Sequence, residues 1–204
     1  MAWKKRRNAL NGLAEGLVKI GALQFGTYTL PDGSVSSYFV NLRSLPSYPG
    51  VYGSVIDALA ELVSKKVTKA DALCAVPITG LLVASPLAVA LRKPLIYTRM
   101  DKQENERLVE GEVRPGWNVV VVGDLATSGK TILSAAEAIQ DEGGRVSSAV
   151  VLIDRLEGAR ERLSKKGITL HAVTDMMELA DALYSMDLIS KENLKSITKS
   201  VEGR

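Results

Sequence analysis

The residues best suited to bind a phosphate lie in the stretch VVVVGDLATSGKTI, which runs from Val119 to Ile132. Its Gly-Lys-Thr suggests the nucleotide P-loop, G-x-x-x-x-G-K-[ST], whose lysine and hydroxyl contact phosphates and magnesium. The spacing differs, because five residues separate Gly123 from Gly129 and Asp124 occupies the position of the first P-loop glycine. The stretch therefore predicts another kind of phosphate site, one that carries a carboxylate.

A strand followed by a helix is expected to position this stretch. The valines at 119–122 are typical of a strand buried on both faces, and apolar residues follow at helical spacing until Gly143 and Gly144. Backbone N–H groups at a helix start bind an oxyanion, whereas Asp124 would repel phosphate and suits the hydroxyls of a sugar. We therefore expect a sugar-phosphate site. The alternative is an ordinary strand-to-helix turn capped by Thr or Ser.

The composition indicates one globular domain. The chain has 204 residues, of which 46% are hydrophobic and 24% charged, with a net charge of +3. The basic residues are scattered apart from the cluster at 4–7, so no nucleic-acid partner is expected. Glu15 and Lys19 interrupt the first apolar run, so we expect no signal peptide, no membrane association and a cytoplasmic protein.

The single cysteine and single histidine argue against several kinds of active site. Cys74 lies in the apolar setting LCAV and is expected to pack in the core. His171 lies in the alternating stretch ITLHAV, which favours a packing role in a strand. Catalytic triads and histidine metal sites are therefore not expected.

The remaining pattern alternates strands and helices. After an N-terminal helix, a hairpin is expected around the turn Pro31-Asp32-Gly33. The expected core strands are 72–76, 94–98, 119–122, 147–153 and 168–173, and the expected helices are 51–63, 81–91, 131–139 and one from Glu157. This alternation predicts an α/β fold with a central five-stranded parallel sheet flanked by helices.

Ligands of such sheets bind beyond the carboxyl ends of the strands. Three loops at those ends carry small or polar residues: 77–80, 124–131 and Asp154-Arg155. The polar stretch TRMDKQENERLVEGE at 98–112 is a candidate lid, since Arg99 and Lys102 could supply cations to a pyrophosphate. The alternatives are a solvated surface loop at 98–112 and a surface ion pair between Asp154 and Arg155.

Five segments carry a family resemblance. VVVVGDLATSGKT resembles the phosphoribosyl pyrophosphate (PRPP) motif of type I phosphoribosyltransferases. FGTYTLPDGSVSSYFVNLR, AVPITGLLVASPLA, RLVEGEVRPG and VLIDRLEGARERLSKKGITLHAV are similar, in this order, to segments of orotate phosphoribosyltransferases. Together they extend from about Gln24 to Leu179.

The resemblance implies a fold and a reaction. The fold is a single phosphoribosyltransferase domain over 1–204, with an N-terminal hood of helix and hairpin at 1–45, a core at 46–185, a C-terminal helix at 186–204 and a flexible lid. The reaction transfers ribose 5-phosphate from PRPP to orotate in de novo pyrimidine biosynthesis, with Mg²⁺ as cofactor. No protein ligand of the metal is assigned.

Site residues follow from the resemblance by position. The residues implied to bind PRPP are Thr79, Gly80, Arg99, Lys102, Asp124, Ala126, Thr127, Ser128, Gly129, Lys130 and Thr131. Lys102 and Asp124 are implied to be catalytic, and Thr127 and Arg155 to bind orotate. A homodimer is implied, in which each lid serves the site of the neighbouring subunit.

Two other functions stay open. A salvage phosphoribosyltransferase for another base is one, since an apolar base would not need Arg155. A catalytically weak PRPP-binding regulator is the other, because the lid RMDKQENE lacks a lysine and a histidine that are common in the family. In addition, Gly123 stands where the family usually has the first of two adjacent acids.

Overall fold

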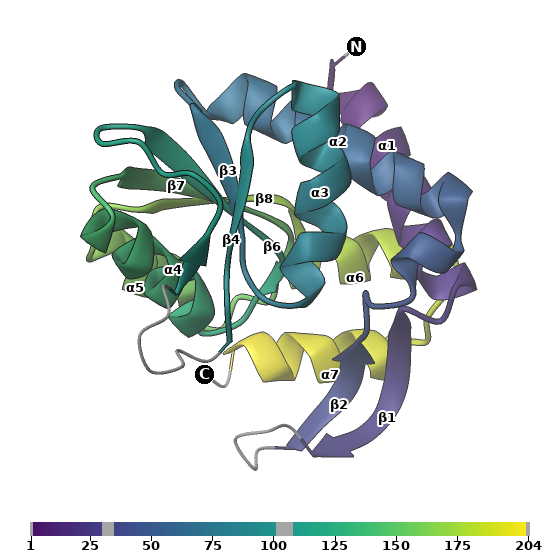
Figure 1. Ribbon diagram of the computed structural model, residues 1–204. Helices are drawn as coiled ribbons and strands as arrows, with labels where there is room; N and C mark the ends of the chain where they lie inside the picture. Colours follow the sequence, from purple (N-terminus) through teal and green to yellow (C-terminus); the bar gives the residue numbers. More distant parts are fainter. Residues whose placement is uncertain (1, 30–34, 101–107, 203–204) are drawn as a thin grey trace. The chain divides into compact units, whose positions relative to one another are not determined.

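The computed structural model describes residues 2–29, 35–100 and 108–202 (Figure 1). The chain divides into two compact units. One combines Met1–Val55 with Thr174–Arg204, and the other comprises Ile56–Val173. The boundary at Val55 falls within helix α2 (Pro49–Lys66).

The second unit is built on a six-stranded sheet in the order β5-β4-β3-β6-β7-β8. The strands are β3 (Ala72–Ala75), β4 (Leu95–Thr98), β5 (Val109–Glu110), β6 (Asn118–Ala126), β7 (Arg145–Asp154) and β8 (Thr169–Asp175). The pairs β3/β4, β3/β6 and β6/β7 are parallel, whereas β5 is antiparallel to β4. The predicted α/β fold is confirmed.

The predicted number of strands is wrong, because β5 lies within the stretch interpreted as a loop. Its two residues pair with the end of β4, Val109 with Thr98 and Glu110 with Tyr97. A strand this short has no alternation of apolar and polar residues that could separate it from a loop.

Three helices connect the strands of this unit. They are α3 (Thr79–Leu91), α4 (Lys130–Asp141) and α5 (Ala159–Ser164). Helix α3 packs on β3, β4 and β6, and α4 packs on β6 and β7. Helix α4 ends where its sequence predicts, with Gly143 in the left-handed region at φ 84° and the Gly144 N–H donating to the Ile139 carbonyl.

The order of the strands creates a switch point between β3 and β6. From β3 the chain crosses through α3 to β4, and from β6 it crosses through α4 to β7, in the opposite direction along the sheet. Ligand crevices of open α/β sheets form at such points, beyond the carboxyl ends of the strands. The centre of the sheet is apolar, since Leu73, Val121 and Val150 are fully buried.

The first unit contains the two ends of the described chain. Its elements are α1 (Ala2–Lys19), the hairpin of β1 (Leu23–Thr29) and β2 (Val35–Val40), the 3-10 helix η1 (Leu45–Ser47), the start of α2, α6 (Met176–Ser185) and α7 (Lys191–Glu202). The predicted hairpin is confirmed by its pairing, although its turn at 31–33 lies outside the described residues.

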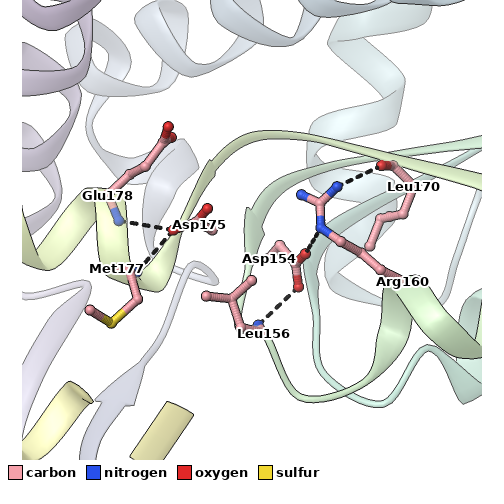
Figure 2. Close-up of polar contacts among 7 residues, drawn as sticks. All are labelled: Asp154, Leu156, Arg160, Leu170, Asp175, Met177 and Glu178. Atoms are coloured by element: carbon pink, nitrogen blue, oxygen red, sulfur yellow. Dashed lines mark hydrogen bonds and ion pairs between the residues drawn. The ribbon is translucent and has the colours of Figure 1, made fainter. Parts of the chain in front are cut away.

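Helix α6 packs against α1 and α7, and α7 packs against β2. Asp175 caps α6 by accepting from the backbone N–H groups of Met177 and Glu178 at 3.0 and 2.9 Å (Figure 2). Throughout the described residues, no helix is both long enough and apolar enough to cross a membrane.

Candidate active site

The loop after β3 lies directly against the end of β6. The Val76 N–H donates to the Val122 carbonyl at 3.0 Å, which continues the parallel pairing of the two strands. Gly80 follows in the first turn of α3, where an added Cβ would lie 2.9 Å from the Val122 carbonyl oxygen and 3.5 Å from Gly123 Cα. The predicted loop 77–80 therefore borders the same crevice as Asp124.

Asp124 belongs to β6 and not to the turn that follows it. The strand continues to Ala126, because Leu125 pairs with Ile153 and Ala126 with Asp154 on β7. The carboxylate is still near the carboxyl end of the strand and is partly exposed. The preceding Gly123 is buried, and an added Cβ would meet the side chains of Val76 and Val151 at 3.4 Å. The first side-chain atoms of an acid at position 123 would thus lie in an apolar environment.

The start of α4 has the features of an anion site. Gly129 is the N-cap residue, with φ 75°, and no side chain caps the helix. The first helical bond runs from the Leu133 N–H to the Gly129 carbonyl, so the N–H groups at 130–132 have no acceptor within the helix. Such groups, together with the helix dipole, favour an anion. The alternative of a turn capped by Thr or Ser is therefore wrong.

The side chains around this helix start differ in accessibility. Thr127 and Ser128 are partly exposed, Lys130 and Thr131 are exposed, and Ala126 is buried at the end of β6. A phosphate at the helix start can therefore be reached by hydroxyl groups and by the Lys130 ammonium group as well as by the backbone.

Helix α5 packs against the predicted phosphate loop, residues 126–131. An added Cβ on Gly129 would lie 3.2 Å from Ala159 Cα, which shows how closely the loop and the helix approach each other. Arg162 of the same helix donates a hydrogen bond to the Ser128 carbonyl. Arg162 could not be predicted from the sequence, because it belongs to a different strand–helix unit and no spacing relates it to Ser128.

Asp154 fixes the turn after β7. Its side chain is 1% exposed and accepts from the Leu156 N–H at 2.9 Å and from Arg160 Nε at 2.6 Å. Arg160 also donates to the Leu170 carbonyl at 3.2 Å (Figure 2). The alternative of a surface pair between Asp154 and Arg155 is therefore wrong, since Asp154 is buried and pairs with Arg160.

Arg155 is buried too, and its charge partner is Glu157. Their side chains are 5% and 8% exposed, and Arg155 Nη2 lies 2.8 Å from Glu157 Oε1. The Arg155 N–H donates to the Ala126 carbonyl at 2.9 Å, which joins this turn to the end of β6. The ends of β3, β6 and β7 thus bring the three predicted loops together.

The cations predicted for the lid are only partly described. Arg99 follows β4 and is partly buried, with Nη1 3.3 Å from Glu110 Oε1 on β5. Strand β5 therefore supplies a carboxylate partner that the sequence pattern did not predict. Lys102 and the centre of the predicted lid lie outside the described residues.

Cys74 and His171 have the packing positions predicted for them. Cys74 is fully buried in β3, and burial raises the pKa of its thiol to about 12. His171 lies in β8, where burial, followed by the charges of Lys66 and Arg160, lowers its pKa. A thiol with so high a pKa is not a nucleophile at neutral pH.

Comparisons with known proteins agree with this arrangement. Residues 44–176 match the phosphoribosyl transferase domain family. The chain is 37% identical over 199 residues to the orotate phosphoribosyltransferase of Cenarchaeum symbiosum, covering 96% of this chain and 98% of that protein.

Solved structures give the same result. The UMP synthase of Leishmania donovani has a TM-score of 0.87 and 29% identity, over 95% of this chain and 42% of that one. The chain thus spans less than half of that synthase. The orotate phosphoribosyltransferase of Mycobacterium tuberculosis in complex with PRPP has a TM-score of 0.67 and 26% identity, over 84% of this chain and 98% of that one. Members of the matched family generally need a divalent metal ion. This chain belongs to the phosphoribosyl transferase family.

Proposed function

We propose that the chain is an orotate phosphoribosyltransferase, which transfers the ribose 5-phosphate group of PRPP to N1 of orotate. The products are orotidine 5′-monophosphate and pyrophosphate, so the reaction belongs to pyrimidine biosynthesis. The uncapped start of α4 beside Asp124, at the switch point of the sheet, is the observation that carries this proposal. The similarity to orotate phosphoribosyltransferases along nearly the whole chain supports the choice of base.

The phosphate loop and Asp124 would bind the ribose 5-phosphate part of PRPP. The 5-phosphate would accept from the N–H groups at 127–131, and Arg162 would hold the loop through the Ser128 carbonyl. Asp124, partly exposed at the end of β6, would accept hydrogen bonds from the ribose hydroxyls. Binding at both ends of the sugar fixes its C1 atom relative to the incoming base.

The pyrophosphate part would lie toward the loop after β3 and the start of the lid. Thr79 and Gly80 would contribute contacts at the start of α3, while Arg99 and Lys102 would supply positive charge. Breaking the bond from C1 to pyrophosphate concentrates negative charge on the leaving group, so these cations would stabilise the transition state more than the ground state.

Mg²⁺ is the divalent ion we propose. It usually binds through one or two carboxylates together with substrate phosphates, and Asp124 offers a carboxylate at the crevice. When bound, the ion would neutralise charge on the pyrophosphate.

Orotate would be recognised by the turn after β7. The planar guanidinium of Arg155 suits the carboxylate of orotate, and the Thr127 hydroxyl would reach the base from the phosphate loop. The hydrogen bond from the Arg155 N–H to the Ala126 carbonyl joins the backbones of these two segments. Because its substrates are multiply charged and do not cross membranes unaided, we place the enzyme in the cytoplasm.

We also propose a homodimer in which Lys102 acts in the site of the neighbouring subunit. Mixing Lys102→Ala chains with Asp124→Ala chains should then restore activity, because each heterodimer contains one site with both residues intact. Random exchange predicts about a quarter of the wild-type activity if the sites are independent. Heterodimers that form and stay inactive, while both variants are folded, would contradict the shared site.

The function can be tested with a panel of bases. Purified protein, PRPP and Mg²⁺ are incubated separately with orotate, uracil, adenine, guanine and hypoxanthine, and consumption of each base is followed. We expect consumption of orotate alone. Consumption of another base would indicate a salvage enzyme, and tight PRPP binding without consumption of any base would indicate a regulator.

A further inference from the structure

The pairing of Arg155 with Glu157 is unusual, because both charges are almost completely buried. Their side chains are 5% and 8% exposed, with 2.8 Å between Nη2 and Oε1. The intervening Leu156 has φ 60°, in the left-handed region that a leucine rarely adopts. This conformation turns the chain so that residues two positions apart lie side by side.

Hydrogen bonds from two successive backbone N–H groups hold the turn. Asp154 accepts from the Leu156 N–H and is itself held by Arg160, as Figure 2 shows. The Arg155 N–H is bound to the Ala126 carbonyl of β6. The carboxylate of Glu157 is therefore kept beside the guanidinium by the fold, unlike a surface carboxylate that can move away into water.

A substrate carboxylate that binds Arg155 must share it with Glu157. A guanidinium has enough N–H groups to engage two carboxylates. In a buried site, however, two negative charges beside one positive charge leave a net negative charge, and like charges at short range repel each other strongly when water is excluded. Each carboxylate therefore weakens the binding of the other.

We propose that Glu157 competes with the carboxylate of the substrate for Arg155 and thereby limits the affinity of the site for orotate. This inference rests on the proposed function, in which Arg155 binds orotate. The product carries the same carboxylate as the substrate, so the competition also weakens product binding. Release of product limits turnover in many enzymes, and Glu157 would therefore favour release at the expense of affinity.

The test is the substitution Glu157→Gln, which keeps the shape and an oxygen acceptor but removes the charge. The dissociation constants of orotate and PRPP are measured separately by calorimetry, together with the thermal midpoint. Orotate should bind about tenfold more tightly, and PRPP should change by less than about twofold. The midpoint should fall without orotate, because Arg155 loses its buried partner, and added orotate should raise it more than in the wild type.

Glu161→Gln is the matched control. Glu161 lies on α5 and pairs with Lys165, but both side chains are largely exposed. Removing its charge should leave both dissociation constants unchanged. An equal effect of the two substitutions would mean that general electrostatics, and not competition for Arg155, causes the change, and would overturn the proposal.

Two further variants complete the test. If Glu157→Gln does not fold, Glu157→Asp withdraws the carboxylate by one methylene and should also tighten orotate binding; unchanged or weaker binding overturns the proposal. Arg155→Met separates this inference from the proposed function. If Arg155→Met weakens orotate binding but neither Glu157 variant tightens it, Arg155 keeps its role and the proposed competition by Glu157 is refuted. If Arg155→Met leaves orotate binding unchanged, the proposed role of Arg155 fails as well.

Discussion

Replacing Gly80 with alanine perturbs the crevice at its most closely packed point. An added Cβ would lie 2.7 Å from Val76 Cγ2 and 2.9 Å from the Val122 carbonyl oxygen. The Val76 methyl group can move slightly, but the carbonyl accepts the hydrogen bond that joins the loop to β6 and cannot be displaced without breaking it. Residues 77–80, which include the first turn of α3, must therefore move away from the strand.

The expected change in the free energy of unfolding follows from comparison with a glycine whose surroundings are open. Gly53 lies exposed in α2 with no atom within 4 Å of an added Cβ. Gly53→Ala should raise the free energy of unfolding by about 0.5 to 1 kcal/mol through the greater helix propensity of alanine. Gly80→Ala gains the same helix propensity, but overpacking against Val76 and the Val122 carbonyl costs about 1 to 3 kcal/mol. The substitution should therefore lower the free energy of unfolding by about 1 kcal/mol.

The assay combines urea unfolding with steady-state kinetics for both variants. A displacement of the loop by about 1 Å should lower kcat/KM for PRPP roughly 100-fold in Gly80→Ala, whereas Gly53→Ala should be as active as the wild type. If Gly80→Ala is stabilised as much as Gly53→Ala and keeps full activity, the close contact between this loop and β6 is not as described.

Two further predictions concern residues around the crevice. Arg162→Met removes the hydrogen bond to the Ser128 carbonyl and should raise the KM for PRPP about tenfold with little change for orotate. The control is Lys165→Met, at the exposed C-cap of the same helix, and equal effects of the two substitutions would argue against a role of Arg162 in loop positioning. The pKa of His171 is lowered by burial and by nearby positive charges, so the unfolded chain takes up a proton more readily. The free energy of unfolding should therefore decrease as the pH falls below about 6.5. His171→Gln should reduce this pH dependence in urea unfolding measured between about pH 7.5 and 5.5. An unchanged pH dependence in the variant would contradict the role of His171.

Much of the fold could be predicted because its signals are local. Runs of β-branched residues, such as the valines of β6, alternate with helical patterns, and Gly143 and Gly144 mark the end of α4 as expected. The positions of the three loops at the crevice could be predicted from a general property of parallel sheets, in which the carboxyl ends of the strands lie at one edge. The antiparallel strand β5 could not be predicted, since two residues contain no periodicity.

The partners of the charged side chains could not be predicted. Asp154 pairs with Arg160 and Arg155 with Glu157, although Asp154 and Arg155 are adjacent in the sequence. The pairing of Arg155 with Glu157 depends on the left-handed conformation of Leu156. A leucine at that position does not indicate this conformation. Asp124 was correctly located near the end of its strand, but the length of β6 is set by pairing with β7 and not by its own residues.

The most direct test of the central claim is to measure the products formed from orotate and PRPP. With Mg²⁺ present, the wild-type chain should form orotidine 5′-monophosphate and pyrophosphate in equal amounts. Asp124→Ala should remain folded and form them about 100-fold to 1,000-fold more slowly, the effect of losing one preorganised polar contact in the transition state. A wild-type chain that forms no orotidine 5′-monophosphate, or an Asp124→Ala variant that forms it at the wild-type rate, would contradict the account.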